Sequence, residues 1–291
     1  MEIQQLRYFV AVVRLKNFSR AAEQCRVAQP SLSQQIMKLE DELGERLLER
    51  TRREAKLTEA GRVFLPHAER VLGELELGRD KVNGIGGVVR GRILLGVIPT
   101  VAPYYLPGVM RAFGKAHQEI QVSVTEATTS ELVRSVQVGE LDLALVSLPV
   151  TTRGVVSVEV FSEALWLALP KGHPLAKRET VKMGELSEEP FMLLQDGHCL
   201  AGQSLEFCTM RGFAPKVTFR SAQMETIQAF VAAGMGVSMV PAMARRTGAG
   251  VVYRALHGKT PERKIGFIHA EERPLTQAVK TLIAFVQQRE S

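Results

Sequence analysis

The chain has 291 residues, of which 45% are hydrophobic and 23% charged, and it carries a net charge of +6 with a pI near 9.3. This length allows two or three compact units with separate cores, and the positive charge favours a polyanionic partner. No apolar run reaches the roughly 18 residues that span a bilayer, and the first residues lack a signal peptide's pattern, so we expect a cytoplasmic protein without membrane contact. Three cysteines in that compartment exclude a disulfide scaffold.

The first 43 residues have the pattern of three short helices. Apolar side chains recur at helical spacing over residues 2–15, and Ser19 is expected to cap a second helix. Residues 26–30 predict a tight turn before a third helix, Ser31 to Leu43, whose apolar side chains face inward. A short helix, a turn and a helix with exposed hydroxyls and amides at its start are typical of proteins that read DNA bases in the major groove.

Residues 44–58 place two short apolar segments on either side of a basic tip, which predicts a two-stranded wing lying against the phosphate backbone. The alternative is a plain helical hairpin with a solvated charged loop, but the order of helix, turn, helix and wing favours DNA binding. The residues expected to contact DNA are Gln29, Pro30, Ser31, Ser33, Gln34, Lys38, Arg50, Arg52 and Arg53.

A long helical pattern runs from Thr58 to about Lys81, and the glycine-rich residues 83–87 break it as a hinge. Beyond the hinge, apolar strands alternate with helices, which predicts an α/β region with a largely parallel sheet covered by helices on both faces. Ligand sites in such sheets lie beyond the carboxyl ends of the strands, where Thr100 and Thr129 stand. The last helix, Leu275 to Gln288, is expected to pack on the first lobe.

Two cysteines stand close together in a polar, glycine-containing stretch. Cys199 follows His198, and a reactive thiol needs such a cation or donor beside it. Cys208 is a candidate resolving thiol, although the spacing is too long for a C-x-x-C motif. The alternative is two ordinary core cysteines, because free cysteine is often buried. Cys25 is expected to fill a small space in the core.

No zinc-ligand spacing, P-loop or glycine-rich dinucleotide motif is present, so we expect neither a metal nor a cofactor.

The segments Phe18-Ser19-Arg20-Ala21-Ala22, Gln29-Pro30-Ser31-Leu32-Ser33-Gln34-Gln35-Ile36 and Leu57-Thr58-Glu59-Ala60-Gly61 closely resemble the winged helix-turn-helix of LysR-type transcriptional regulators. The resemblance implies a DNA-binding domain over residues 1–58, a linker (dimerisation) helix with its hinge over 59–87, and a two-lobed, periplasmic-binding-protein-like α/β regulatory domain over 88–291. Lobe I would comprise about 88–163 plus 268–291, and lobe II about 164–267.

The resemblance further implies a homo-oligomer, a dimer or a tetramer, that binds operator DNA and RNA polymerase as a transcription activator. The run Gly197-His198-Cys199-Leu200, together with Gln203, Cys208, Thr100 and Thr129, resembles the OxyR-type peroxide-sensing subfamily. In that subfamily the residue matching Cys199 is the peroxidatic thiol and the one matching Cys208 resolves it.

The same resemblance implies that Thr100, Thr129, His198 and Gln203 shape the peroxide pocket. Gly202 departs from the pattern, because an acidic residue is usual there. We therefore expect a regulator that senses hydrogen peroxide by a reversible Cys199–Cys208 disulfide, which cellular thiols reduce again.

Two other functions fit parts of the sequence. A LysR-type regulator can respond to a small metabolite between its lobes, with the cysteines taking no part. A thiol-dependent peroxidase would use the same cysteines, but the DNA-binding segment argues against an enzyme.

Overall fold

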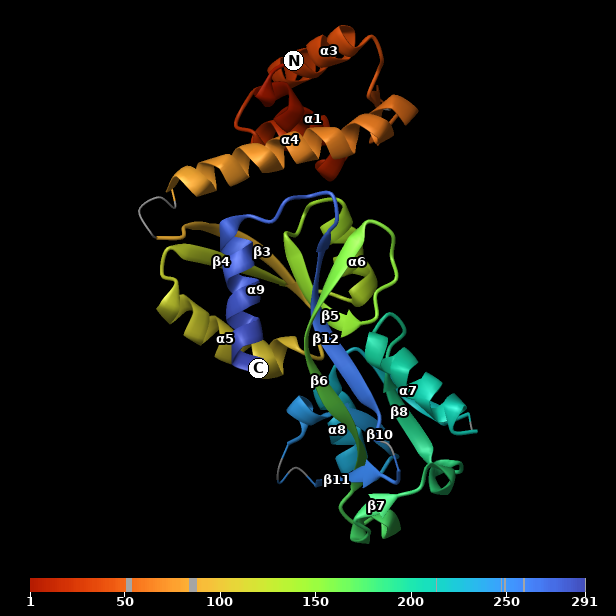
Figure 1. The fold of residues 1–291 in the computed structure, drawn as a ribbon. Helices are drawn as coiled ribbons and strands as arrows, with labels where there is room; N and C mark the ends of the chain where they lie inside the picture. The colour runs from red at the N-terminus through yellow and green to blue at the C-terminus, as the bar shows by residue number, and fades with distance from the viewer. Residues whose placement is uncertain are drawn as a thin grey trace. The chain divides into compact units, whose positions relative to one another are not determined.

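A computed structural model describes residues 1–50, 54–83, 88–212, 214–246, 248, 250–258 and 260–290 (Figure 1). The chain forms two compact units: residues 1–91 with 270–280, and residues 92–269 with 281–291. Within the described ranges, no helix has both the length and the apolar character needed to cross a membrane.

The first unit is a winged helix-turn-helix followed by a long helix, as predicted. Its elements are α1 (Ile3–Leu15), α2 (Phe18–Gln24), α3 (Gln29–Leu43), β1 (Leu48–Arg50), β2 (Ala55–Leu57) and α4 (Glu59–Asn83). Fully buried side chains of α1 and α3, among them Phe9, Ile36 and Leu39, form its core. The wing is an antiparallel pair in which Leu48 lies opposite Leu57 and Arg50 opposite Ala55.

Two helix starts differ from the expectation. Asn17, not Ser19, caps α2, because its side-chain oxygen accepts the backbone N–H groups of Ser19 and Arg20 at 2.9 and 3.0 Å. Helix α3 begins at Gln29, two residues early, because Pro30 fits the first turn, where its missing N–H costs nothing.

The second unit is built on an eight-stranded sheet with helices packed around it. Its strands and helices are β3 (Gly91–Val97), α5 (Ala102–Ala116), β4 (Ile120–Glu126), α6 (Thr129–Gln137), β5 (Leu143–Leu148), β6 (Val155–Pro170), β7 (Thr180–Val181), β8 (Pro190–Leu194), α7 (Cys199–Met210), β9 (Lys216–Ser221), α8 (Met224–Ala232), β10 (Ser238–Pro241), β11 (Val251–Leu256), β12 (Glu262–Ala270) and α9 (Gln277–Glu290).

The strand order is β4-β3-β5-β12-β6-β11-β7, with β10 also paired to β6. The sheet is mixed and not largely parallel: β3 and β5 run parallel, whereas β12 is antiparallel to β5, and both β10 and β11 are antiparallel to β6. The central strands β12 and β6 extend from one lobe into the other (Figure 1). Gly266 of β12 permits their close approach, since a Cβ there would lie 2.6 Å from the carbonyl oxygen of Val158.

Helix α9 packs on α5 in the first lobe, as expected. The rings of Phe285 and Phe113 meet edge to face at 5.3 Å, and the Tyr105 hydroxyl donates to Glu290 at 2.8 Å. Helix α7, which contains both cysteines of the polar stretch, was not among the predicted helices.

Glu40 connects α3 to the wing. Its carboxylate, only 8% exposed, accepts the backbone N–H groups of Leu47 and Leu48 at 2.8 and 3.0 Å. The connection fixes where the chain leaves α3 and enters the β-hairpin.

We expect Glu40→Ala to lower the free energy of unfolding of the first unit by about 2 kcal/mol, because two buried donors lose their acceptor. Native-state hydrogen exchange of residues 44–57 measures the loss. Asp41→Ala, at the exposed neighbouring position, is the matched control and should change it by less than about 0.5 kcal/mol. Equal exchange in the two variants would show that Glu40 does not hold the wing.

Candidate functional site

Helix α7 carries both thiols and holds them apart. Cys199 is its first residue and is half-buried, whereas Cys208 is fully buried in the core of the second lobe. Nine residues of α-helix correspond to about 13.5 Å of rise and two and a half turns, so the two side chains project on opposite sides of the helix. Their Cα atoms are thus separated by about 14 Å, twice the roughly 7 Å limit for a disulfide.

The two thiols also differ in environment. Burial raises the pKa of Cys208 to about 11, so this thiol stays protonated at neutral pH. Cys199 is the first residue of α7 and is only half-buried. The two thiols therefore differ in accessibility: Cys199 is half-buried, whereas Cys208 is buried and protonated.

A cavity of about 600 Å³ lies beside Cys199. It is open to solvent and lies between the start of α6, the loop after β5 and the first half of α7. The residues that line it are Thr129, Ser130, Val133, Pro149, Val150, Thr151, Thr152, Asp196, Gly197, His198, Cys199, Ala201, Gly202 and Leu205. Three of the residues expected at the site, Cys199, His198 and Thr129, therefore share one cavity.

Two of the residues that line the cavity, Thr129 and His198, have polar groups that can form hydrogen bonds. The Thr129 hydroxyl oxygen is buried and has no hydrogen-bond partner in the described protein, so it can both donate to and accept from a bound molecule. His198 is 9% exposed, and burial lowers its pKa against the opposing effect of Glu126 and Glu131. A neutral imidazole at neutral pH offers one N–H donor.

Gln203 and Thr100 do not line this cavity. The Gln203 amide donates to the Ser147 hydroxyl at 2.9 Å, which ties α7 to the end of β5. The Thr100 hydroxyl accepts from Arg263 Nη1 at 2.7 Å, and the Thr100 carbonyl accepts from Nη2 at 3.1 Å. Both residues hold neighbouring elements in place.

Arg263 and Glu163 form a buried ion pair that sequence reasoning missed. Their side chains are 0% and 7% exposed and meet at 2.6 Å, and Glu163 also accepts the Met243 backbone N–H at 3.1 Å. The pair joins strands β12 and β6 to the start of α5 through Thr100. No local sequence pattern predicts this ion pair, because Glu163 and Arg263 are one hundred residues apart in the sequence.

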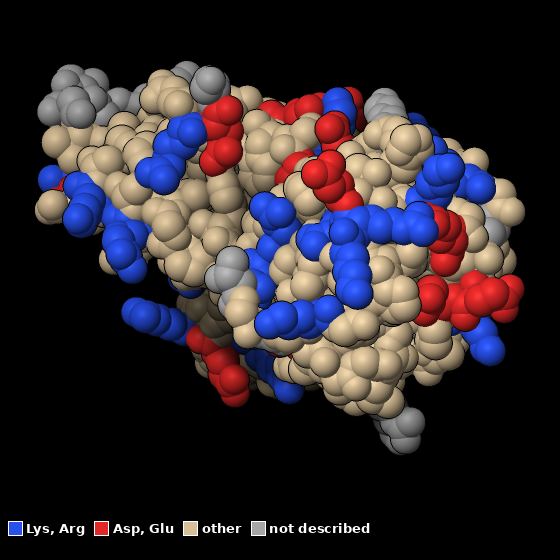
Figure 2. Space-filling view, turned by 90° about the horizontal axis from the view of Figure 1, so that it is seen from below, with Lys and Arg blue, Asp and Glu red and all other residues tan. Residues whose placement is uncertain are grey.

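The expected DNA-contacting residues of α3 lie on its exposed surface, with Ser33 half-buried. Arg52 and Arg53, and the side chain of Arg50, lie outside the described residues. Basic and acidic side chains both occur on the face drawn in Figure 2. This face is therefore not purely basic.

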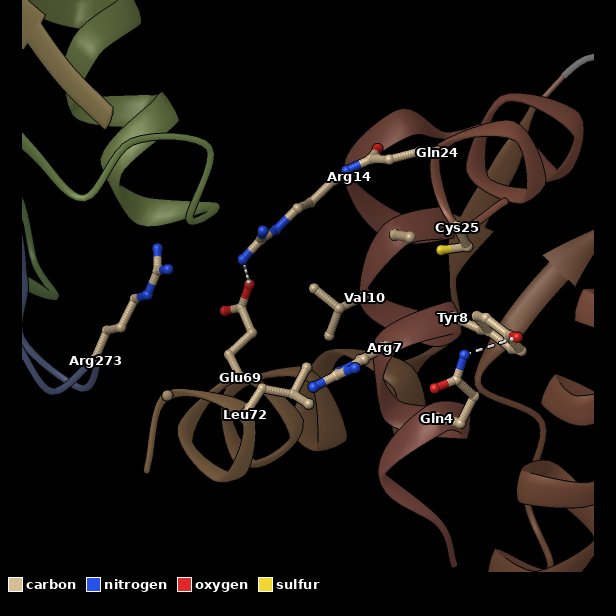
Figure 3. A pocket seen from close by; sticks show the side chains of 12 residues that line it. Gln4, Arg7, Tyr8, Val10, Arg14, Gln24, Cys25, Glu69, Leu72 and Arg273 are labelled. Atoms are coloured by element: carbon tan, nitrogen blue, oxygen red, sulfur yellow. Dashed lines mark hydrogen bonds and ion pairs between the residues drawn. The ribbon is translucent and has the colours of Figure 1, made fainter. Parts of the chain in front are cut away.

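Cys25 belongs to a different pocket, in the first unit (Figure 3). The thiol is half-buried, packs against the core of that unit and lines the pocket with Arg7 and Tyr8. Burial raises its pKa more than the nearby Arg7 lowers it. This environment agrees with a structural role for Cys25.

Comparison with known families defines the class of protein. A sequence profile described as "Bacterial regulatory helix-turn-helix protein, lysR family" matches residues 3–62, and one described as "LysR substrate binding domain" matches residues 86–291. The chain belongs to the LysR family of bacterial regulators, whose members are transcriptional regulators and not enzymes.

Among the proteins and solved structures that the chain resembles are OxyR proteins. The chain is 36% identical to the "DNA-binding transcriptional dual regulator OxyR" of Escherichia coli, covering 99% of this chain and 96% of that protein. It is 37% identical to the "Hydrogen peroxide-inducible genes activator" of Dickeya chrysanthemi, covering 94% and 91%. Full-length OxyR C199D from Pseudomonas aeruginosa has the same fold, with a TM-score of 0.80, 26% identity and coverage of 99% and 98%.

We expect Cys208 to be alkylated far more slowly than Cys199 in the reduced, folded protein. With a pKa of about 11, only about 0.1% of Cys208 is thiolate at pH 8, and this fraction should rise about tenfold per pH unit as the pH increases toward 11. Timed iodoacetamide labelling with peptide mass spectrometry measures all three thiols. The three rates should converge in urea, and rapid labelling of Cys208 in the folded protein would contradict its burial.

We also expect Glu163→Ala to lower the free energy of unfolding by about 3–5 kcal/mol, because it leaves Arg263 buried without its partner. The double variant Glu163→Leu with Arg263→Met should recover more than half of this loss. Urea unfolding followed by the fluorescence of Trp166, the single tryptophan, reports the change. Lys264→Ala breaks an exposed pair on the same strand and should cost less than about 1 kcal/mol.

Proposed function

We propose that the protein is a DNA-binding transcriptional regulator that senses hydrogen peroxide through reversible formation of a Cys199–Cys208 disulfide. The single observation that carries this proposal is the placement of Cys199 at the start of α7 in a cavity shared with His198 and the unpartnered Thr129 hydroxyl. The relatives named for OxyR and for activation by hydrogen peroxide support it.

We assign a separate function to each of three successive parts of the chain. Residues 1–58 bind operator DNA through the start of α3 and the wing, residues 59–87 pair two subunits, and residues 88–291 hold the sensor in two lobes. The protein acts as a homo-oligomer, a dimer or a tetramer, and contacts RNA polymerase as an activator. A cellular thiol reductant resets it.

The chemistry takes two steps. The Cys199 thiolate attacks one peroxide oxygen, the O–O bond breaks, an S–O bond forms, and the leaving hydroxide takes a proton to become water. His198 and Thr129 supply hydrogen bonds that hold the peroxide and stabilise the leaving oxygen. Cys208 then attacks the sulfenic acid sulfur and releases a second water, so the two thiols together give up two electrons.

The second step requires α7 to unwind, because its helical geometry keeps the cysteines about 14 Å apart. Unwinding removes four buried residues, Leu200, Ala201, Ser204 and Cys208, from their packing. It also breaks the hydrogen bond between Gln203 and Ser147. A local covalent change is thereby converted into repacking of the second lobe, which shifts the populations of regulator conformations on DNA.

Gly202 favours this unwinding. A glycine inside a helix costs roughly 1 kcal/mol relative to alanine, because the unfolded chain has more freedom there. Gly202 has no neighbour within 4 Å of a built Cβ, so packing does not require a glycine at this position. The residue that departs from the subfamily pattern thus lies in the segment that has to unfold.

We expect equimolar hydrogen peroxide to produce a Cys199–Cys208 disulfide within minutes while Cys25 stays free. Mass spectrometry after alkylation maps the bond, and Cys208→Ser should stop the reaction at a sulfenic acid on Cys199. Cys25→Ser is the control and should form the same bond at the same rate. Free thiols at both positions after peroxide treatment would overturn the proposal.

The cavity also supports a second function, regulation by a small metabolite bound beside α6 and α7, since about 600 Å³ is an ordinary size for a ligand site. Cys199→Ser separates the two functions. A metabolite-responsive regulator keeps its response in this variant, whereas a peroxide-responsive one loses it.

A further inference from the structure

Ser147 is a polar residue in an otherwise apolar, buried strand. The other residues of β5 are leucine, alanine and valine, and Ser147 itself is only 3% exposed. A buried hydroxyl group destabilises the fold unless it forms hydrogen bonds. The hydrogen-bond partners of Ser147 therefore show what this serine does in the strand.

The shortest hydrogen bond of Ser147 comes from helix α7. The Ser147 hydroxyl accepts from Gln203 Nε2 at 2.9 Å, and its own proton has Gln203 Oε1 at 3.3 Å and the Lys264 carbonyl oxygen at 3.5 Å as acceptors. The two side chains belong to elements that are 56 residues apart in the sequence. The contact thus ties the cysteine-bearing helix to a strand of the large sheet.

Gln203 lies between the two cysteines on α7. It comes four residues after Cys199 and five residues before Cys208. Four residues are about one helical turn, so the hydrogen bond to Ser147 holds the turn that follows Cys199 against β5. A disulfide requires this part of α7 to unwind, since a regular helix keeps the two Cα atoms about 14 Å apart. The bond to Ser147 therefore belongs to the helical, reduced form.

We propose that Ser147 is a positioning residue that sets the redox equilibrium of the Cys199–Cys208 pair. This rests on the proposed function and deepens it, because it assigns control of the disulfide step to a residue outside α7 and outside the cavity. The Ser147 hydroxyl stabilises the dithiol form through Gln203 and loses this bond in the disulfide form. Ser147 thereby makes the disulfide easier to reduce.

The size of the effect follows from the exposure of Gln203. This side chain is half-buried, so its amide can bond to water when the Ser147 hydroxyl is absent. The contribution of Ser147 is then the net value of one hydrogen bond, which corresponds to about a fivefold change in an equilibrium constant. For a two-electron couple, a fivefold change is about 20 mV.

The test measures the equilibrium of the full-length protein with a glutathione buffer. One molecule of oxidised glutathione accepts two electrons from the Cys199 and Cys208 thiols, the protein S–S bond forms, and two molecules of reduced glutathione leave with the two protons. Alkylation of the remaining thiols and mass spectrometry give the equilibrium constant. We expect Ser147→Ala to raise the constant for disulfide formation about fivefold, which makes the reduction potential about 20 mV more negative.

Two further measurements separate this role from a general loss of stability. Hydrogen exchange of the α7 amides 203–207 in the reduced protein should become about fivefold faster in Ser147→Ala, while protected β12 amides show that the sheet is intact. The rate at which hydrogen peroxide consumes the Cys199 thiol should not change, because Ser147 does not line the cavity.

Ser238→Ala is the matched control. Ser238 is also a buried strand serine, 2% exposed, and its hydroxyl donates to the Met192 carbonyl oxygen at 2.7 Å, a contact between β10 and β8. Loss of this bond should leave the equilibrium constant and the exchange of α7 unchanged. Gln203→Ala removes the α7 side of the proposed contact, so adding Ser147→Ala to it should shift the constant no further.

The outcomes distinguish the two proposals. If the wild-type protein forms the disulfide but Ser147→Ala has the same equilibrium constant as Ser238→Ala, the role of Ser147 is wrong and peroxide sensing stands. Additive effects of Ser147→Ala and Gln203→Ala also overturn this role, because Ser147 would then act through a different contact. If neither hydrogen peroxide nor oxidised glutathione produces the disulfide in the wild-type protein, both proposals fail.

Discussion

The separation of the two cysteines depends on the geometry of one α-helix. Helix α7 begins at Cys199 and contains Cys208 nine residues later, so a regular helix must hold the two thiols about 14 Å apart and on opposite sides. One thiol opens into a cavity and the other lies in a hydrophobic core. As long as α7 is intact the two cysteines stay unlinked, and any bond between them requires this helix to unfold.

The surroundings of α7 set the cost of that unfolding. Leu200, Ala201 and Cys208 pack into the second lobe, and Gln203 bonds to Ser147. Gly202 lowers the cost, because a glycine inside a helix favours the unfolded chain. The buried pair of Arg263 and Glu163 lies on the long strands β12 and β6, which are neighbours in the sheet. In the proposed mechanism, unwinding of α7 beside this sheet turns a change at one thiol into a change in the shape of the lobe.

Much of the fold was predictable from local patterns. Residues 2–43 repeat apolar side chains at helical spacing and residues 2–58 carry a contiguous family motif, so the winged helix-turn-helix was predictable. The cap of α2 and the start of α3 were misplaced, because Asn17 and Ser19 are equally good cap residues and Pro30 fits the first turn of α3. Most strands of the second unit were predicted from apolar runs, but β7 and β11 were not. The strand directions were not predicted either, because pairing such as Ile265 with Ser147 is set by tertiary structure.

The site was predictable in part. The motif around Cys199 and the position of Thr129 pointed to residues that do share a cavity. Helix α7 itself was missed, since its apolar residues do not form a clear stripe and Gly202 interrupts it. The link from Thr100 to Arg263 joins residues 163 positions apart, and such a contact leaves no local signal.

Hydrogen exchange of the α7 amides, residues 199–210, before and after oxidation shows whether this helix unwinds when the disulfide forms. We expect these amides to be protected in the reduced protein and to lose their protection once the Cys199–Cys208 disulfide has formed, while the amides of β6 and β12 stay protected. A disulfide that forms with α7 still fully protected would contradict it, because an intact helix cannot bring the two sulfur atoms together.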